Sequence, residues 1–198
     1  MKEVILMDSN IDKSSNRFSS FIVDWGDSII RALIIILFIL TFICKTCTVV
    51  GTSMCNTLDD GDKLVISNFL YNPKENDIIV FHQTGALNEA CVKRIIATEN
   101  KWVRIDFDNG NVYVSNDNVF ENSEIIDESD YAYLDIGRYK MRGVKDYEVP
   151  SGYVFVMGDN RNNSTDSRSE YIGVVDENTI LGKVLFRLSP FDKFGFLN

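Results

Sequence analysis

Residues 149–168 read VPSGYVFVMGDNRNNSTDSR, an apolar run that changes abruptly into a charged loop. Branched and aromatic side chains dominate the first part, GYVFVM, which is typical of a buried β-strand. The loop after it contains Asp159, Arg161, Asp166 and Arg168. Because Asp–Arg pairs form bidentate hydrogen bonds of fixed geometry, we expect these four side chains to hold the loop in one shape.

Two other interpretations of this loop are open at the level of the sequence. Asp and Asn side chains also bond to nearby backbone groups in ordinary polar turns. Asp159 and Glu170 have the spacing of the first and last positions of an EF-hand calcium loop. Arg161 and Ser164 stand where that loop requires an oxygen ligand and a glycine, so we do not expect calcium.

Six further segments have strand character and are separated by Gly, Asn, Asp and Pro. Several of them alternate apolar and polar residues, as half-buried strands do. These segments are residues 62–71, 76–83, 91–98, 101–108, 110–116 and 182–188. The sequence therefore predicts a mainly β fold, built on a coiled or closed antiparallel sheet. Residues 104–145, largely acidic and weakly patterned, are expected to form a small peripheral β insert.

The composition excludes several classes of function. The net charge of −9 repels nucleic acid, so we expect no nucleic-acid partner. Cys44 and Cys47 form the single C-x-x-C motif, and His82 is the only histidine. Because a structural zinc site needs four such ligands, we expect no metal and no cofactor. We treat the cysteines as small apolar residues.

The most apolar part of the chain, residues 29–50, has a length close to the roughly 20 residues of a membrane-spanning helix. Arg31 and Lys45 bracket its uncharged centre, where long side chains reach the headgroups, and Trp25 suits the interface. A buried core helix is rarely apolar on every side, and a cleaved secretory signal has a shorter polar head. We therefore predict a membrane anchor.

The distribution of positive charge sets the orientation of this anchor. Lys2, Lys13, Arg17 and Arg31 precede it, and only Lys45 follows closely. Cytoplasmic flanks carry the excess of Lys and Arg, which places the N-terminus in the cytoplasm. We expect a single-pass protein of the cell membrane with three regions: a cytoplasmic tail (1–27), a transmembrane anchor (28–48) and an extracytoplasmic β domain (49–198).

Residues 49–58, VVGTSMCNTL, place Ser53 directly after the apolar segment. A serine acts as a nucleophile only when a base lies within hydrogen-bond reach, and most serines are surface or capping residues. His82 is the one histidine that a catalytic triad could use, and nothing else in the sequence supports it. A lysine base needs burial, which lowers its pKa from about 10.4.

Lys93 meets this requirement, because it lies within the apolar strand segment CVKRIIAT. On strict alternation Cys91, Lys93 and Ile95 share one face of the strand, and Arg94 points to the other. A strand lysine also commonly extends from a sheet edge into water. The pattern alone leaves a buried base and an edge lysine both open.

Together these stretches resemble the type I signal peptidases, membrane-bound Ser–Lys endopeptidases that remove signal peptides from exported proteins. The resemblance runs from about Asp27 to Phe196. GTSMCNTL resembles the family's nucleophile motif, and GDKLVIS resembles the motif that follows it. NDIIVF and VKRIIA together resemble the motif that holds the lysine base. VPSGYVFVMGDNRNNSTDSR, with IGVV and ILGKVLFRLSPFDKFG after it, is the closest match. Several motifs in order are specific where one alone is not.

The resemblance implies a role for each site residue. Ser53 is implied as the nucleophile and Lys93 as the general base, with the Ser53 backbone N–H as an oxyanion donor. Ser164 resembles the family serine that hydrogen-bonds and orients the lysine. Met54 resembles the residue that packs against the lysine base. The supporting polar lattice is implied for Asp159, Arg161, Asp166 and Arg168. The family fold, a coiled sheet of SH3-like barrels with a smaller β cap, agrees with the expected strands.

Three positions of the nucleophile motif need comment. Gly51 lacks the hydroxyl that some members use as a second oxyanion donor, a variant common among Gram-positive members. Asn56 stands where the family usually has proline, which would pre-set the turn. Cys55 lies two residues from Ser53, but a competing thiol would need a lowered pKa.

The implied partners are membrane-inserted preproteins with small residues at positions −1 and −3, together with the lipid bilayer. Contact with the protein translocation machinery is a further option. Two alternatives remain: a related peptidase dedicated to one substrate or to a conjugation pathway, and a membrane-anchored binding domain without catalysis.

Overall fold

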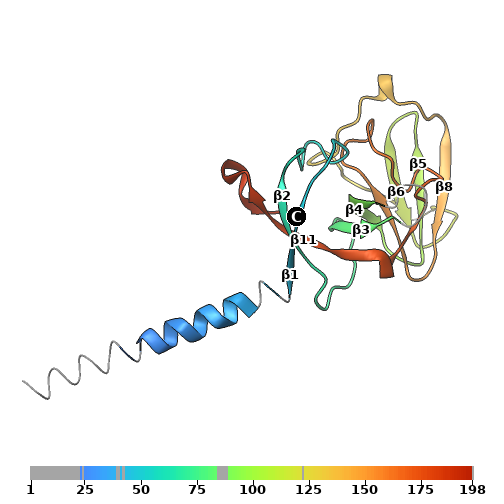
Figure 1. Ribbon diagram of the computed structural model, residues 1–198. Helices are drawn as coiled ribbons and strands as arrows, with labels where there is room; N and C mark the ends of the chain where they lie inside the picture. Colours follow the sequence, from blue (N-terminus) through green and yellow to red (C-terminus); the bar gives the residue numbers. More distant parts are fainter. Residues whose placement is uncertain are drawn as a thin grey trace, which may run out of the picture. The chain divides into compact units, whose positions relative to one another are not determined.

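The structure, a computed structural model, describes residues 23, 25–38, 41, 43–83, 89–121 and 123–197. The chain divides into two compact units, Met1–Ile43 and Cys44–Asn198. The first unit contributes a helix over residues 25–38, and the second holds the strands described below (Figure 1). Within the described ranges, no helix combines the length and the apolar character needed to cross a membrane.

The larger of two sheets has eight strands, which pair in the order β1-β2-β11-β3-β4-β9-β10, with β12 beside β11. Its strands are β1 (Cys44–Thr48), β2 (Lys63–Ser67), β3 (Ile78–His82), β4 (Ala90–Ala97), β9 (Tyr153–Met157), β10 (Val175–Asp176), β11 (Ile180–Ser189) and β12 (Gly195–Phe196). All pairs are antiparallel. The order ends at β1 and β10, which do not pair with each other, so the expected closed SH3-like barrel is not formed by the described strands.

The smaller sheet is the expected insert, and it is wider than predicted. It has four antiparallel strands in the order β7-β6-β5-β8. They are β5 (Lys101–Asp106), β6 (Asn111–Ser115), β7 (Glu124–Ile125) and β8 (Val144–Val149). Figure 1 shows β5, β6 and β8 side by side, away from β1 and β2. The insert therefore runs over residues 101–149 rather than 104–145.

The mainly β class is confirmed, and each segment predicted as a strand contains one. The predicted segments correspond to β2, β3, β4, β5, β6, β9 and β11. Ile78 and Val80 of β3 belong to one apolar cluster, and Ile79 and Phe81 to another. Because β3 is buried on both faces, its sequence reads as a continuous apolar run rather than as an alternation.

The structure differs from the predicted anchor at its C-terminal end. Cys44–Thr48, assigned by sequence to the last part of the anchor at 28–48, forms β1 and pairs with β2 over its full length. The β-branched residues Thr46 and Thr48 favour a strand at this point. Val49, directly after β1, is buried in the apolar core. The anchor boundary at residue 48 is therefore wrong, because these residues complete the edge of the sheet.

We expect removal of residues 1–48 to destabilise the remaining domain more than removal of residues 1–43. Only the longer deletion removes β1 and leaves the β2 edge unpaired. Each lost backbone hydrogen bond costs about 0.5–1.5 kcal/mol, and each kcal/mol lowers the midpoint of thermal unfolding by about 2–4 °C at this chain length. Calorimetry on the two truncated proteins measures the difference. Equal melting temperatures would contradict a structural role for β1.

Candidate active site

Ser53 lies in a tight turn between β1 and β2. The turn is closed by backbone hydrogen bonds from Cys55 N to Thr52 O, at 3.2 Å, and from Leu58 N to Met54 O, at 2.8 Å. Met54 and Leu58 point inward and are fully buried in the same apolar cluster as Ile78 and Val80. Packing of these two side chains in the core therefore fixes the nucleophile turn, while the Ser53 side chain remains half-buried at the surface.

Lys93 lies on β4, where it faces Ile79 of β3, and its side chain is buried, with 5% relative exposure. Its Nζ donates a hydrogen bond to Ser53 Oγ at 2.8 Å and another to the Val92 carbonyl at 2.9 Å. Ile95, on the same face, belongs to an apolar cluster, and Cys91 packs against that cluster. Lys93 is therefore a buried lysine in contact with Ser53, and not a lysine at a sheet edge.

Burial is the main cause that lowers the pKa of the Lys93 amine, and the positive charge of Arg168 acts in the same direction. Cys91, Asp166 and Asp159 oppose the shift without reversing it. A lysine with a lowered pKa is more often neutral and can accept a proton. A neutral amine bonded to a serine hydroxyl is the arrangement that activates serine as a nucleophile.

Asp159 joins the strand that carries the base to the turn that carries the nucleophile. Arg94, next to Lys93 on β4, donates from Nε and Nη2 to the two Asp159 oxygens, at 3.0 and 2.8 Å. The Thr57 hydroxyl, in the nucleophile turn, donates to the same carboxylate. Arg94 is 2% exposed and Asp159 is 0% exposed, so the ion pair is shielded from water.

Arg94 was not predicted as a site residue. The sequence did contain a signal for it, because an arginine inside a buried strand needs a charged or polar partner. The strand alternation correctly predicted that Arg94 points away from the face of Lys93. The identity of its partner, 65 residues further along the chain, is a property of the tertiary structure.

Asp166 and Arg168 form a second buried pair, as expected. Arg168 donates from Nε and Nη2 to Asp166, both at 2.7 Å, and the Gly158 N–H donates to Asp166 at 2.9 Å. Burial disfavours the charged carboxylate, but the charge and hydrogen bonds of Arg168 hold the pKa of Asp166 below its usual value. Arg168 also donates to the Tyr139 hydroxyl and, at 3.0 Å, to the Arg161 carbonyl.

Arg161, the fourth member of the predicted lattice, takes its charged partner from the insert. Its two terminal nitrogens donate to the Glu128 carboxylate. The four lattice residues are therefore buried and paired, but only Asp166 and Arg168 pair with each other. Glu128 was not predicted, because its stretch of sequence is acidic throughout and nothing in it distinguishes this carboxylate.

Ser164 does not hydrogen-bond Lys93 in this structure, in contrast to the implied role. The buried Ser164 hydroxyl lies instead beside the Asp166 carboxylate and helps to lower the pKa of that group. Its side chain packs on Gly158: an added Cβ at Gly158 would lie 2.3 Å from Ser164 Oγ and 2.5 Å from the Ser53 carbonyl oxygen. Glycine at 158 thus allows the loop to approach Ser53 closely, and Ser164 fills the space above that glycine.

The nucleophile turn explains two of the three unusual residues in its motif. Gly51 has a φ of +91°, which glycine adopts readily, and its N–H donates to Asp60 Oδ1 at 2.8 Å. Asn56 has a φ of +95°, which the ring of proline forbids. Burial, followed by the charges of Asp59 and Asp60, raises the pKa of the Cys55 thiol, which disfavours it as a competing nucleophile.

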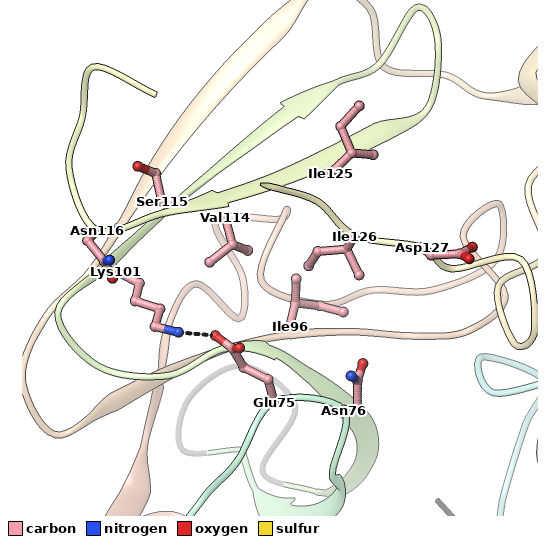
Figure 2. A pocket seen from close by; sticks show the side chains of 10 residues that line it. All are labelled: Glu75, Asn76, Ile96, Lys101, Val114, Ser115, Asn116, Ile125, Ile126 and Asp127. Carbon is pink, nitrogen blue, oxygen red and sulfur yellow. Dashed lines mark hydrogen bonds and ion pairs between the residues drawn. The ribbon is translucent and has the colours of Figure 1, made fainter. Parts of the chain in front are cut away.

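A cavity of about 440 Å³ lies away from these residues, between the end of β4 and the insert. Figure 2 shows Ile96, Val114, Ile125 and Ile126 around it, with Lys101 Nζ bonded to Glu75 Oε1 at 2.6 Å. Neither Ser53 nor Lys93 lines this cavity. The chemistry described above is therefore located at the Ser53 turn and not in this cavity.

A buried amine bonded to a serine hydroxyl, on a mainly β domain, is the arrangement that a serine hydrolase with a lysine base requires. The family model described as "Signal peptidase, peptidase S26" matches residues 22–189. The chain belongs to this family of serine peptidases.

Curated relatives of the chain carry matching names. "Probable signal peptidase I-1" of Synechocystis sp. is 36% identical over 176 residues, which cover 84% of this chain and 82% of that protein. "Probable signal peptidase I-2" of the same organism is 32% identical over 205 residues, covering 100% and 86%. "Signal peptidase IB" of Staphylococcus aureus is 31% identical over 185 residues, covering 87% and 92%.

We expect Asn56→Pro to destabilise the domain by about 1–3 kcal/mol, because proline cannot adopt the positive φ of this turn. Asn56→Gly, the matched control, keeps this φ accessible and should stay close to wild type. Thermal unfolding, together with the labelling rate of Ser53 by a serine-directed acylating probe, measures both variants. A proline variant as stable and as reactive as wild type would show that the turn has another conformation.

The lowered pKa of Lys93 predicts a pH-dependent stability. Between that pKa and about 10.4 the unfolded chain binds a proton at this lysine that the folded chain does not, so stability rises with pH across this interval. Lys93→Met removes this dependence and should be stabilising relative to wild type at pH values below the lowered pKa. Denaturant unfolding of both proteins at several pH values measures the difference in their free energies of unfolding. A stability difference that does not shrink as the pH rises would contradict the shift.

Proposed function

We propose that this chain is a membrane-bound serine endopeptidase that removes N-terminal signal peptides from exported preproteins, with Ser53 as nucleophile and Lys93 as general base. The hydrogen bond of 2.8 Å between Lys93 Nζ and Ser53 Oγ, in a buried setting, is the observation that supports this most strongly. Membership of the signal peptidase family supplies the reaction class and the substrate class.

The proposed reaction follows from the contact between the two side chains. Neutral Lys93 takes the Ser53 proton as Oγ attacks the scissile carbonyl, and the Ser53 backbone N–H donates to the oxyanion that forms. Lys93 then gives the proton to the leaving amine, which frees the mature protein. Water, activated by the same amine, hydrolyses the ester on Ser53 and restores both groups.

The remaining site residues support this pair. Asp159, Asp166 and Arg168 keep the loop beside Ser53 rigid through buried hydrogen bonds of charged groups. Met54 anchors the nucleophile turn in the core. Ser164 acts by packing over Gly158, in place of the implied bond to the lysine.

The substrate and the membrane topology complete the proposal. Preproteins inserted in the bilayer, with small residues at positions −1 and −3, are the substrates expected of this family. A single span by the apolar segment ahead of β1, with a cytoplasmic N-terminus, puts Ser53 close to the outer face of the bilayer, where the cleavage site emerges. Contact with the translocation machinery would deliver substrates to this position.

Cleavage of a model preprotein in vesicles tests the proposed function. With alanine at positions −1 and −3 of the substrate, the full-length wild type should cleave. Ser53→Ala and Lys93→Ala should each lose activity by about 10⁴-fold or more, because removing one member of a catalytic pair disables both. Lys183→Ala is the matched control: it removes a lysine of the same sheet, half-exposed and paired with Asp77.

The control variant should retain cleavage at the wild-type position. If Lys93→Ala cleaves as fast as wild type, the Ser–Lys mechanism is wrong. If the wild type leaves every preprotein intact, the proposed activity is wrong.

A further inference from the structure

The insert supplies one charged residue to the network beside Ser53. Arg161 donates from Nη2 to Glu128 Oε1 at 2.6 Å and from Nη1 to Glu128 Oε2. The two side chains are 3% and 11% exposed. A planar guanidinium and a carboxylate that meet with two parallel bonds fix each other's orientation as well as their distance.

We propose that Glu128 is a positioning residue for catalysis: through Arg161 it holds the loop at residues 158–163 against Ser53. The proposal rests on the function proposed above, because the quantity that Glu128 controls is the placement of the nucleophile. It gives the insert, the part of the chain that least resembles the family, a role in the reaction.

Arg161 transmits the position of Glu128 to the loop backbone. Its Nε donates to the Gly158 carbonyl at 3.0 Å, so the side chain folds back on its own loop. Its carbonyl accepts a hydrogen bond from Arg168 Nη1 at 3.0 Å, which joins it to the pair of Arg168 and Asp166. A shift of the guanidinium therefore acts on the loop at Gly158, while Arg168 holds the backbone at Arg161.

The loop in turn holds the backbone of the nucleophile turn. The Asn160 N–H donates to the Ser53 carbonyl at 3.0 Å, and the Asn160 side chain donates to the Thr52 carbonyl at 3.1 Å. Gly158 lies so close that a Cβ there would be 2.5 Å from the Ser53 carbonyl oxygen. The Asn163 side chain also donates to the Thr52 hydroxyl, at 2.6 Å. The loop thus has no freedom to move toward Ser53, and moving away breaks three hydrogen bonds to its turn.

Neighbouring contacts align the insert with the loop along several residues. The Tyr133 N–H donates to the Asp159 carbonyl at 2.7 Å, and the Arg161 N–H donates to the Tyr133 carbonyl at 2.9 Å. These two bonds flank Asn160, the residue that contacts Ser53. The ring of Tyr131 lies 4.0 Å from the Arg94 guanidinium, beside the Asp159 pair. Glu128 is the residue of this segment that contributes a charge to Arg161.

Glu128→Gln removes that charge while keeping the size and shape of the side chain. Arg161 is then left as a buried cation without its counter-charge, which favours a shifted loop in which water reaches the guanidinium. A displacement of about 1 Å at a reacting group costs up to about 10²-fold in rate. We therefore expect kcat for preprotein cleavage to fall by about 10- to 100-fold, with KM changed by less than about threefold.

The test compares four full-length proteins in vesicles: wild type, Glu128→Gln, Asp146→Asn and Ser53→Ala. Asp146→Asn is the matched control, because it removes a partly exposed carboxylate of the same insert that pairs with Arg104 and makes no hydrogen bond to the loop among the described residues. For the three proteins that keep Ser53, rates are expressed per Ser53 that reacts with an acylating probe, so that unfolded molecules do not contribute, and Ser53→Ala is measured per total protein. Thermal midpoints are measured in parallel.

The proposal predicts the stated fall in kcat for Glu128→Gln alone, with Asp146→Asn within about twofold of wild type. It is overturned if Glu128→Gln keeps the wild-type kcat per reactive serine, if Asp146→Asn loses as much, or if only KM changes. A wild type that does not cleave, beside an equally inactive Ser53→Ala, contradicts the proposed function instead. The two failures are therefore distinguishable.

Discussion

The Asp159 carboxylate is the point on which the arrangement of this domain depends. It accepts hydrogen bonds from Arg94 on the strand of the base and from Thr57 in the nucleophile turn. A fully buried carboxylate is tolerated only when its charge and its lone pairs are satisfied, so these partners cannot separate without a large penalty. Ser53 and Lys93 are 40 residues apart in sequence. The hydrogen bonds to Asp159 hold the turn that carries Ser53 next to the strand that carries Lys93.

The charges around Lys93 are arranged so that burial controls its protonation. Asp159 is paired with Arg94, and Asp166 with Arg168, so each nearby carboxylate already has a counter-ion. Both carboxylates still favour an ammonium on Lys93, but burial is the largest effect and lowers its pKa in spite of them. Of the residues in these pairs, Arg168 acts in the same direction as burial and favours the neutral amine. Structure and chemistry are coupled through one set of ion pairs.

Sequence patterns predicted the parts of this structure that depend on local information. The strands with continuous apolar or alternating residues were predicted correctly, and so was the separation of Lys93 and Arg94 onto opposite faces. β1 was missed because CKTCT follows the apolar segment directly and Lys45 suits the end of a membrane span, whereas its strand state depends on pairing with β2. Likewise Glu128 is marked only by its contact with Arg161, 33 residues away. Such contacts are set by the fold and leave no periodicity in the sequence.

The central claim is that Lys93 is held as a neutral amine against Ser53, and its own titration tests this most directly. Nitrogen-15 NMR of the Lys93 side chain in the folded protein reports the protonation state across the pH range. We expect this amine to titrate clearly below the value of about 10.4 found for free lysine. In Asp159→Asn the Lys93 resonance should change, because the support of the strand and the turn is altered. A Lys93 amine that titrates at or above the value of free lysine in the folded wild type would contradict the account.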